Sequence, residues 1–418
     1  MNTKNYREIP YNFTSADDKL IINLLFGTEV WEDLEELRSQ RLTGRSARLV
    51  MRFMGDLFIL RRNPFLFQEL LDLPGKRQRF FDTAGEDLTI IEEAVLSLLA
   101  QTYGNLEILV INDRSVDGTA QVLKRLQTLH PHLLVQEITH LPDGWMGKSH
   151  ALAQGAALPS GEYLLFTDAD VVMEPTTISR AMRHMQDDRL DHLSLIFKNL
   201  GGGCLLNCLI LDMALGFFLF FRPWRVRLKG SREFIGIGAF NLVKRTAYDA
   251  VGGHESIRMH PIDDLMLGKI LKEQGFHQDC LMAHGFIAVP WYDTVRAMAD
   301  GLQKNTFAFV HYRLFFIPPI IVFLVVLNIL PLWGAIFCEG VARLFWLLTV
   351  GMKLLGFYFG LCRQGLPRWY LVGALLAPYL SLYIICNSAI VVQKNDGITW
   401  RGRHYALAEL KKSRRLFL

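Results

Sequence analysis

Two aspartates separated by one residue, Asp168 and Asp170, follow a short apolar run that begins after Gly161. The run is typical of a buried strand, and ligands in an open α/β sheet bind at the carboxyl ends of its strands. Alternate strand residues point to the same side, so the two carboxylates can converge on one divalent cation. We therefore expect them to hold a metal ion on a diphosphate. A solvated turn after the strand is the alternative interpretation of this tripeptide alone.

A second candidate is Lys148, in a turn-rich loop that also contains Trp145. The lysine stands just before an alanine-rich stretch, residues 151–157, that is typical of a helix. Backbone amides at a helix N-terminus suit an anion, and a lysine beside them adds positive charge. The alternative is an ordinary exposed loop lysine.

A third carboxylate, Asp113, ends the β-type run that starts at Leu106, and a helical pattern of apolar residues precedes this run. After Asp113 the pattern predicts a helix through Leu129 and then a strand over residues 133–138. Helices that alternate with strands are typical of a parallel sheet. The sequence therefore predicts an α/β fold with carboxylates at the ends of two strands.

The adjacent pair Asp263 and Asp264 precedes a predicted helix over residues 265–274. Aspartates in this position commonly cap a helix, and a capping carboxylate can also accept a proton. Shortly before the pair, residues 236–241 form a glycine-spaced stretch that we expect to be a strand. Its glycines allow either close approach to a ligand or tight packing.

Apolar segments in the last quarter of the chain predict a membrane protein. Residues 314–338 and 369–393 contain no charge, and each is long enough to cross a hydrocarbon core of about 30 Å. Residues 341–362 carry Arg343 and Lys353; we favour a third span, with an interfacial helix as the alternative. Residues 204–223 are expected to lie at the membrane surface, with a core or spanning helix as the alternative.

Charge and cysteine usage exclude several classes of protein. The net charge of +4 argues against nucleic acid as a partner, and the six scattered cysteines indicate neither a disulfide framework nor a zinc site. No signal peptide is apparent, which predicts a cytoplasmic N-terminal part. The basic tail over residues 396–418 should also stay in the cytoplasm, so we expect only two of the three segments to cross fully.

Taken together, the motifs resemble the inverting family 2 nucleotide-sugar glycosyltransferases. The resemblance covers about residues 86–410 and is greatest for the membrane-bound branch associated with carotenoid and hopanoid biosynthesis, which shares the tail signature at 397–405. Four motifs in order are far more specific than any one of them. They are residues 112–119, 144–148, 167–170 and 263–264.

The resemblance implies a GT-A domain, over residues 76–310. The residue pattern predicts an N-terminal helical region, 1–75, of unknown role, and transmembrane helices over 311–395. The resemblance also implies Mg²⁺ or Mn²⁺ as the cofactor. The implied roles are a base or ribose contact for Asp113, donor contacts for Trp145 and Lys148, metal ligands for Asp168 and Asp170, the catalytic base for Asp264 with Asp263 beside it, and acceptor or lipid contacts for Arg401 and Arg403.

The chain departs from the family in places. Where the first nucleotide-binding strand belongs, residues 77–86 are short and polar, and an N-terminal membrane anchor is missing. Residues 303–305 replace the Gln-x-x-Arg-Trp motif of processive polymerases, which favours transfer of a single sugar. We therefore expect an integral protein of the cytoplasmic membrane, its catalytic domain cytoplasmic, that moves one sugar from a nucleotide-sugar, a UDP-sugar in our expectation, to a lipid-type acceptor.

A membrane scaffold and a transporter are the other functions to compare with this expectation. A catalytically impaired membrane scaffold that retains the fold is the alternative, because the altered first strand weakens the donor site. A transporter is disfavoured, because few ionisable groups lie within the apolar segments.

Overall fold

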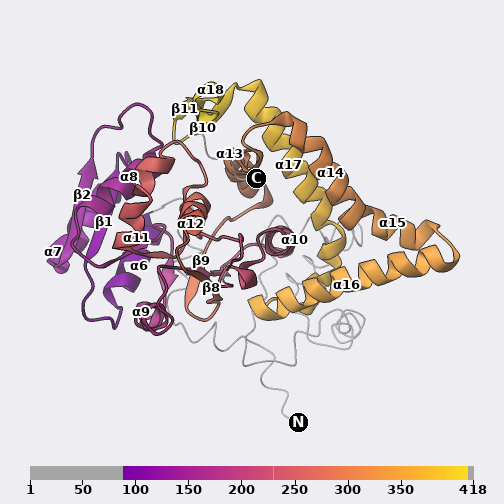
Figure 1. The fold of residues 1–418 in the computed structure, drawn as a ribbon, viewed down its shortest axis with the longest axis horizontal. Helices are drawn as coiled ribbons and strands as arrows, with labels where there is room; N and C mark the ends of the chain where they lie inside the picture. Colours follow the sequence, from indigo (N-terminus) through magenta and orange to yellow (C-terminus); the bar gives the residue numbers. More distant parts are fainter. Residues whose placement is uncertain (1–87, 229, 413–418) are drawn as a thin grey trace, which may run out of the picture.

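The computed structural model describes residues 88–228 and 230–412 (Figure 1). The expected N-terminal helical region and the altered stretch at 77–86 therefore lie outside the described residues. An α/β body occupies one side of the molecule, and long apolar helices extend from the other side (Figure 1). The α/β class that the sequence predicts is confirmed.

The first part of the body is a parallel pair of strands covered by helices. Strand β1 pairs with β2 from Ile108 opposite Leu133 onward, and both residues are buried. Leu123 and Leu126 of helix α7, one turn apart, pack onto this pair together with Val95 of helix α6. The predicted helix–strand alternation is confirmed here. The bounds are α6 Leu88–Leu99, β1 Ile108–Asp113, α7 Thr119–Leu129 and β2 Leu133–Ile138.

The larger sheet is mixed rather than parallel. Its strand order is β3-β7-β5-β8, in which β7 runs antiparallel to both neighbours and only β5 and β8 are parallel. The prediction of a strand over 236–241 is wrong, because the pairing of β7 begins only at Asn241. The strands are β3 Tyr163–Phe166, β5 His192–Ile196, β7 Asn241–Lys244 and β8 Gln278–Met282; a smaller sheet combines β4 Val172–Met173, β9 Ile287–Val289 and β6 Lys198–Asn199.

Helix α12 is the most deeply buried helix of the site region. Its Met266, Leu267, Ile270 and Leu271 are fully buried, so two successive turns contribute to the main core. Such a helix holds the side chains at its N-terminus in fixed positions. The bounds of α12 are Asp263–Glu273. Other helices of the body are α8 Gly147–Ala157, α9 Thr177–Asp187, α11 Arg245–Ala250 and α13 Val295–Thr306.

Among the residues that the structure describes, three helices are long and apolar enough to cross a membrane: Cys204–Arg225, Leu314–Phe337 and Gly340–Gln364. A further pair, Arg368–Leu375 and Ala377–Lys394, meets the same test as one span bent by 51°. The predicted segments 314–338, 341–362 and 369–393 thus all correspond to helices. Within them lie α14 Ile317–Leu324, the π-helical η7 Val325–Ile329, α15 Leu330–Phe337, α16 Gly340–Gln364, η8 Arg368–Leu375 and α17 Ala377–Lys394.

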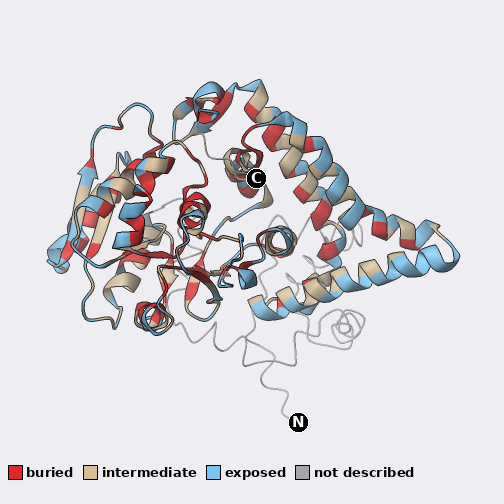
Figure 2. Cartoon of the chain, viewed as in Figure 1, coloured by how far each residue is buried: buried red, intermediate tan, exposed pale blue. Residues whose placement is uncertain are grey.

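Helix α10, Cys204–Phe221, differs from the other apolar helices in its surroundings. Half of its apolar window is buried inside the protein, against 17% for Leu314–Phe337 and 11% for Gly340–Gln364. The two less buried helices expose large apolar side chains along their length (Figure 2), among them Phe323, Phe337, Leu344, Phe345 and Met352. A continuous apolar surface of this kind suits contact with lipid.

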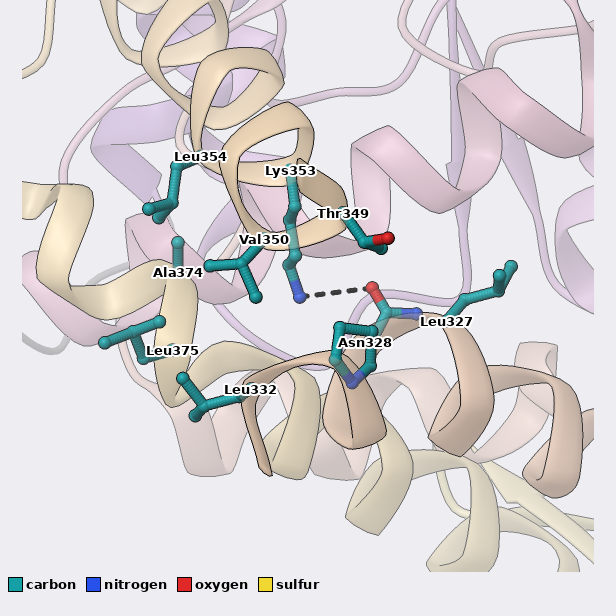
Figure 3. Close-up of a pocket in the computed structure, with 10 residues that line it drawn as sticks. Leu327, Asn328, Leu332, Thr349, Val350, Lys353, Leu354, Ala374 and Leu375 are labelled. Carbon is teal, nitrogen blue, oxygen red and sulfur yellow. Dashed lines mark hydrogen bonds between the residues drawn. The ribbon is translucent and has the colours of Figure 1, made fainter. Parts of the chain in front are cut away.

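A small polar cluster connects several of these helices, and Figure 3 shows one part of it, the hydrogen bond between Lys353 and Asn328. The Lys353 ammonium of α16 donates to Asn328 Oδ1 in the π-helical turn at 3.1 Å, and it lies 3.4 Å from Asp212 Oδ1 of α10. Ser381 of α17 donates to the other Asp212 oxygen at 2.7 Å. Of the two charges in the 341–362 segment, that of Lys353 is therefore paired with a carboxylate and does not face lipid alone.

We expect Asp212→Asn to destabilise the protein by about 3–5 kcal/mol, because it leaves the Lys353 ammonium buried without its carboxylate. Thermal unfolding in one detergent measures the effect. Asp300→Asn, which removes an exposed carboxylate of α13, is the control. Asp212→Leu combined with Lys353→Met should recover most of the loss, since it removes both charges together. Equal unfolding temperatures for Asp212→Asn and the control would contradict this account.

Candidate active site

Lys148 lies at the centre of a charged cluster near the N-terminus of α8. Its ammonium is 2.7 Å from Asp168 Oδ1 and 3.7 Å from Asp263 Oδ1. Burial lowers the pKa of Lys148, but the charges of Asp168, Asp263 and Asp264 outweigh burial and raise this pKa above its ordinary value. The Lys148 side chain is therefore a cation at neutral pH.

The two aspartates after β3 have different environments. The Asp168 backbone N–H donates to the Gly238 carbonyl at 3.1 Å, which fixes the chain just beyond the strand. One buried oxygen of Asp170 has no hydrogen-bond partner among the described residues. Burial first, and then the charge of Asp168, raise the pKa of Asp170 to about 6.

An unsatisfied, buried carboxylate oxygen beside a second carboxylate is a donor set that suits a hard divalent cation. Repulsion from the charge of Asp168 adds to the effect of burial in raising the pKa of Asp170. Asp168 keeps a half-exposed side chain in addition to its ion pair with Lys148. These residues therefore fit Mg²⁺ or Mn²⁺.

The acidic pair forms the first turn of α12. Asp263 is buried, whereas Asp264 is half-buried and accepts a hydrogen bond from the Gly238 N–H to Oδ2 at 2.8 Å. Burial is the main cause that raises the pKa of both carboxyl groups, to about 6 for Asp263. A carboxylate with a raised pKa is a better proton acceptor near neutral pH.

One small cavity, open to solvent, brings four of the predicted residues together. It is lined by Lys148, Asp168, Asp263 and Asp264, which come from α8, the end of β3 and the start of α12. His254 and Asn241 complete its polar wall. Asp170, Asp113 and Trp145 do not line this cavity; Asp170 and Trp145 lie next to segments that build it, and Asp113 lies at the end of β1.

Asp113 ends β1 and lies against the start of α8. Its carboxylate forms a two-pronged ion pair with Arg114, with distances of 2.8 Å and 3.0 Å. A Cβ added at Gly147 would lie only 2.7 Å from Asp113 Oδ2, so the glycine before Lys148 allows this close packing. Trp145 packs edge-on against His150 of the same helix.

Arg401 and Arg403 belong to a C-terminal hairpin that returns to the body. The hairpin pairs β10, Gly397–Trp400, with β11, Arg403–Ala406. Arg403 forms an ion pair with Asp143 at 3.1 Å, in the loop that contains Trp145. Arg401 sits in the turn between the strands with a φ of 45°. The structure therefore places Arg403 beside the loop before α8, and Arg401 in the adjoining hairpin turn.

Gly236 and Gly238 are tightly packed, which is one of the two alternatives that the sequence offers for them. A Cβ at Gly236 would overlap the Asp264 carbonyl, and one at Gly238 would lie 2.6 Å from Asp168 Oδ2. The segment therefore passes between Asp168 and the start of α12 only because it lacks these side chains. The glycine spacing was the available signal; the segment's irregular backbone was not predictable from it.

Gly236→Ala should cost at least about 1–3 kcal/mol of stability and most of the activity, because the new methyl group displaces Asp264. The matched control is Gly285→Ala, where nothing lies within 4 Å of the added Cβ. Unfolding temperature and turnover, measured on both variants, check the prediction. A Gly236→Ala protein with the activity of the control would show that this contact does not position the acidic pair.

The first part of the body is similar to known proteins. The family described as "Glycosyl transferase family 2" matches residues 84–252, and one described as "Protein of unknown function (DUF3683)" matches residues 4–126. The Escherichia coli (strain K12) protein "Uncharacterized glycosyltransferase YibD" is 33% identical over 108 residues, which are 26% of this chain and 29% of that protein.

Longer matches have lower identity. The "4,4'-diaponeurosporenoate glycosyltransferase" of Staphylococcus haemolyticus is 23% identical over 231 residues, or 50% of this chain and 56% of that protein. A solved structure, "Mannosyltransferase PcManGT from Pyrobaculum calidifontis in complex with GDP-Man and Mn2+", is 17% identical over 70% of this chain and 84% of that chain, with a TM-score of 0.42. The chain thus spans only 29% and 56% of the two curated relatives.

The family match begins just before α6 and ends after α11. It therefore contains Asp113, Lys148, Asp168 and Asp170, whereas the acidic pair at the start of α12 lies beyond it. The motifs that the sequence analysis singled out and the residues matched coincide in this region. Over residues 84–252, the chain is similar to glycosyl transferase family 2.

Proposed function

We propose that this chain is a membrane-bound inverting glycosyltransferase that transfers one sugar from a nucleotide-sugar to a lipid-type acceptor. The observation that carries the proposal is the cluster in which Lys148 contacts Asp168 and Asp263 next to the unsatisfied oxygen of Asp170. In one site, the cluster provides a cation that can bind phosphate, carboxylates that can ligate a divalent metal and a carboxylate that can act as a base.

The leaving group in this reaction is a nucleoside diphosphate, whose negative charge must be neutralised as its bond to the sugar breaks. Lys148 contacts the phosphates, because its charge is retained and it lines the cavity. Asp168 and Asp170 would hold Mg²⁺ or Mn²⁺, which neutralises phosphate charge without proton transfer. Asp113 and Trp145 contact the nucleotide from the neighbouring loops.

Asp264 acts as the base in this proposal. It takes the proton of the acceptor hydroxyl while that oxygen bonds to the anomeric carbon and the bond from this carbon to the diphosphate oxygen breaks. Asp264 is the more exposed of the acidic pair, and the Gly238 N–H holds its carboxylate in place. Asp263, buried against Lys148, positions the pair.

The acceptor is proposed to be a lipid, because apolar helices with exposed side chains follow directly after the catalytic body. A carotenoid-type acceptor is suggested by the similarity to the diaponeurosporenoate enzyme. We place the protein in the cytoplasmic membrane with its catalytic domain and basic tail in the cytoplasm. We propose a UDP-sugar as donor, but GDP-sugars belong in every assay, since the solved neighbour holds GDP-Man.

Lipid extracts test this function directly. Cells that carry the wild-type gene, the Asp264→Asn variant or no gene are compared by mass spectrometry. The proposal predicts a sugar-bearing lipid in the wild-type extract only. Identical lipids in all three extracts would favour the alternative, a membrane scaffold that keeps the fold without transfer.

A further inference from the structure

His254 lines the cavity of the candidate active site, but no step of the proposed reaction uses it. It lies in the short 3-10 helix η4, Gly253–Ile257, and its side chain is 1% exposed. The ring packs edge-on against Phe166, the last residue of β3, with ring centroids 4.7 Å apart. This packing holds a polar ring in a fixed position beside the strand that leads to Asp168.

The hydrogen bonds of Tyr248 determine which ring nitrogen of His254 carries the proton. The Tyr248 hydroxyl accepts from the His254 backbone N–H at 3.0 Å, and its oxygen lies 2.9 Å from His254 Nδ1. Among the described residues, Nδ1 is the only acceptor within hydrogen-bond distance of this hydroxyl. The hydroxyl therefore donates to Nδ1, and the ring proton of a neutral His254 is on Nε2.

The Nε2–H group of His254 is a neutral donor that faces the cavity. Burial first, and then the charge of Lys148, lower the pKa of the imidazole to about 3, so the ring is neutral at pH 7. Tyr248 does not line the cavity, so the Nδ1 side of the ring is turned away from it and the Nε2 side toward it. In the described parts of the chain, no hydrogen-bond partner is found for Nε2. A buried donor without a partner gains free energy when an acceptor binds.

The size and the wall of the cavity suit one hydroxyl group. Its volume is about 10 Å³, which is room for a single water-sized group. A hydroxyl can accept from His254 and donate its own proton to Asp168 or Asp263, which also line the cavity. A phosphate oxygen only accepts, and it would face these carboxylates as a like charge. The Lys148 side chain is 35% exposed, so it can meet phosphates outside the cavity.

The donor sugar is the better source of this hydroxyl. The acceptor hydroxyl must attack the anomeric carbon, and a hydrogen bond from His254 to the attacking oxygen would hold the electron pair that forms the new bond. The hydroxyl groups of the donor sugar make no new bond, so one of them can stay bound throughout the reaction. In the proposed reaction the sugar lies between the diphosphate at Asp168 and the base Asp264, and both carboxylates line the cavity.

We propose that the cavity receives one hydroxyl group of the donor sugar, that His254 Nε2–H donates a hydrogen bond to it, and that His254 thereby selects the sugar. The proposal rests on the proposed function and deepens it. A site built to bond a hydroxyl discriminates against a sugar that lacks it, because the buried N–H then stays unpaired.

Calorimetric titration of the purified full chain in detergent, with Mn²⁺ and without acceptor, tests the proposal. The ligands are UDP, GDP, UDP-glucose, UDP-galactose, UDP-N-acetylglucosamine and GDP-mannose, followed by the monodeoxy forms of the nucleotide-sugar that binds most tightly. We expect one monodeoxy form to bind the wild type about tenfold more weakly than its parent. UDP and GDP give the affinity of the diphosphate alone.

Two substitutions of His254 separate its two nitrogens. His254→Asn keeps an oxygen near the place of Nδ1 for the Tyr248 hydroxyl and removes the donor at the cavity. It should bind the parent nucleotide-sugar about tenfold more weakly, bind UDP and GDP like the wild type, and lose nothing further with the sensitive monodeoxy form. His254→Gln, whose amide N–H can replace Nε2–H, should bind the parent within about threefold of the wild type.

The control is His132→Asn, which changes an exposed histidine before β2, away from the cavity, and should bind every ligand like the wild type. Unfolding temperatures identify a folding defect in any variant. If both His254 variants fold poorly, the monodeoxy series on the wild type decides alone.

Equal affinity of the wild type for all monodeoxy forms would overturn the inference, and so would wild-type affinity of His254→Asn for the nucleotide-sugar. Equal weakening of nucleotide-sugar and diphosphate in a folded His254→Asn would also overturn it, and would assign the N–H to a phosphate. All three results leave the proposed function standing. A wild-type protein that binds neither UDP nor GDP in the presence of Mn²⁺ would contradict the proposed function, and this inference with it.

Discussion

Asp264→Asn is expected to lower kcat by about a hundredfold or more while binding of the nucleoside diphosphate stays near the wild-type value. The substitution removes the proton acceptor but keeps a side-chain oxygen to accept from the Gly238 N–H. It also preserves the shape of the first turn of α12. Steady-state transfer kinetics and calorimetric binding, measured on the same preparation, separate the two effects.

Asp249→Asn is the matched control, because Asp249 is an exposed aspartate of α11 away from the cavity. It should leave both kcat and binding unchanged. If Asp264→Asn weakened diphosphate binding as much as it lowered kcat, Asp264 would belong to the nucleotide pocket, and the base would have to be sought elsewhere.

Asp170→Asn is expected to abolish metal-dependent turnover without lowering stability. The folded state raises the pKa of Asp170 to about 6, above its ordinary value of 3.8, so ionisation of this carboxyl opposes folding as the pH rises through this range. At pH 7 without metal, the neutral amide should therefore unfold at the same temperature as the wild type or a higher one. Adding Mn²⁺ should stabilise the wild type and leave the variant unchanged.

Thermal unfolding with and without Mn²⁺, together with turnover over a Mn²⁺ titration, measures both parts of this prediction. Asp187→Asn, at the exposed end of α9, serves as the control and should respond to Mn²⁺ like the wild type. A wild-type rate for Asp170→Asn at limiting Mn²⁺ would rule out Asp170 as a metal ligand.

The parts of the fold that the sequence predicted are those with a local signal. The apolar run at β3, the helix start beside Lys148 and the acidic first turn of α12 each follow from residues within a few positions of one another. The apolar segments near the C-terminus were recognisable for the same reason, since length and lack of charge are local properties.

Features that depend on distant partners could not be predicted in this way. Strand β7 lies between β3 and β5 and makes the sheet mixed, and nothing in its own four residues indicates that pairing. The sequence identified Lys353 as a charge in an apolar segment, but its partner Asp212 comes from another helix. The contact of Lys304 with Trp400 likewise joins two segments that no local pattern connects.

Sugar transfer by the purified chain tests the central claim most directly. The protein is reconstituted with membrane lipids and given radiolabelled UDP- and GDP-sugars with Mn²⁺, and label is counted in the organic phase. We expect label in the lipid fraction. This label should require Mn²⁺ and should be absent with the Asp264→Asn variant. If a folded wild-type protein labels no lipid with any donor and also fails to bind nucleoside diphosphate, this result would contradict the claim of sugar transfer.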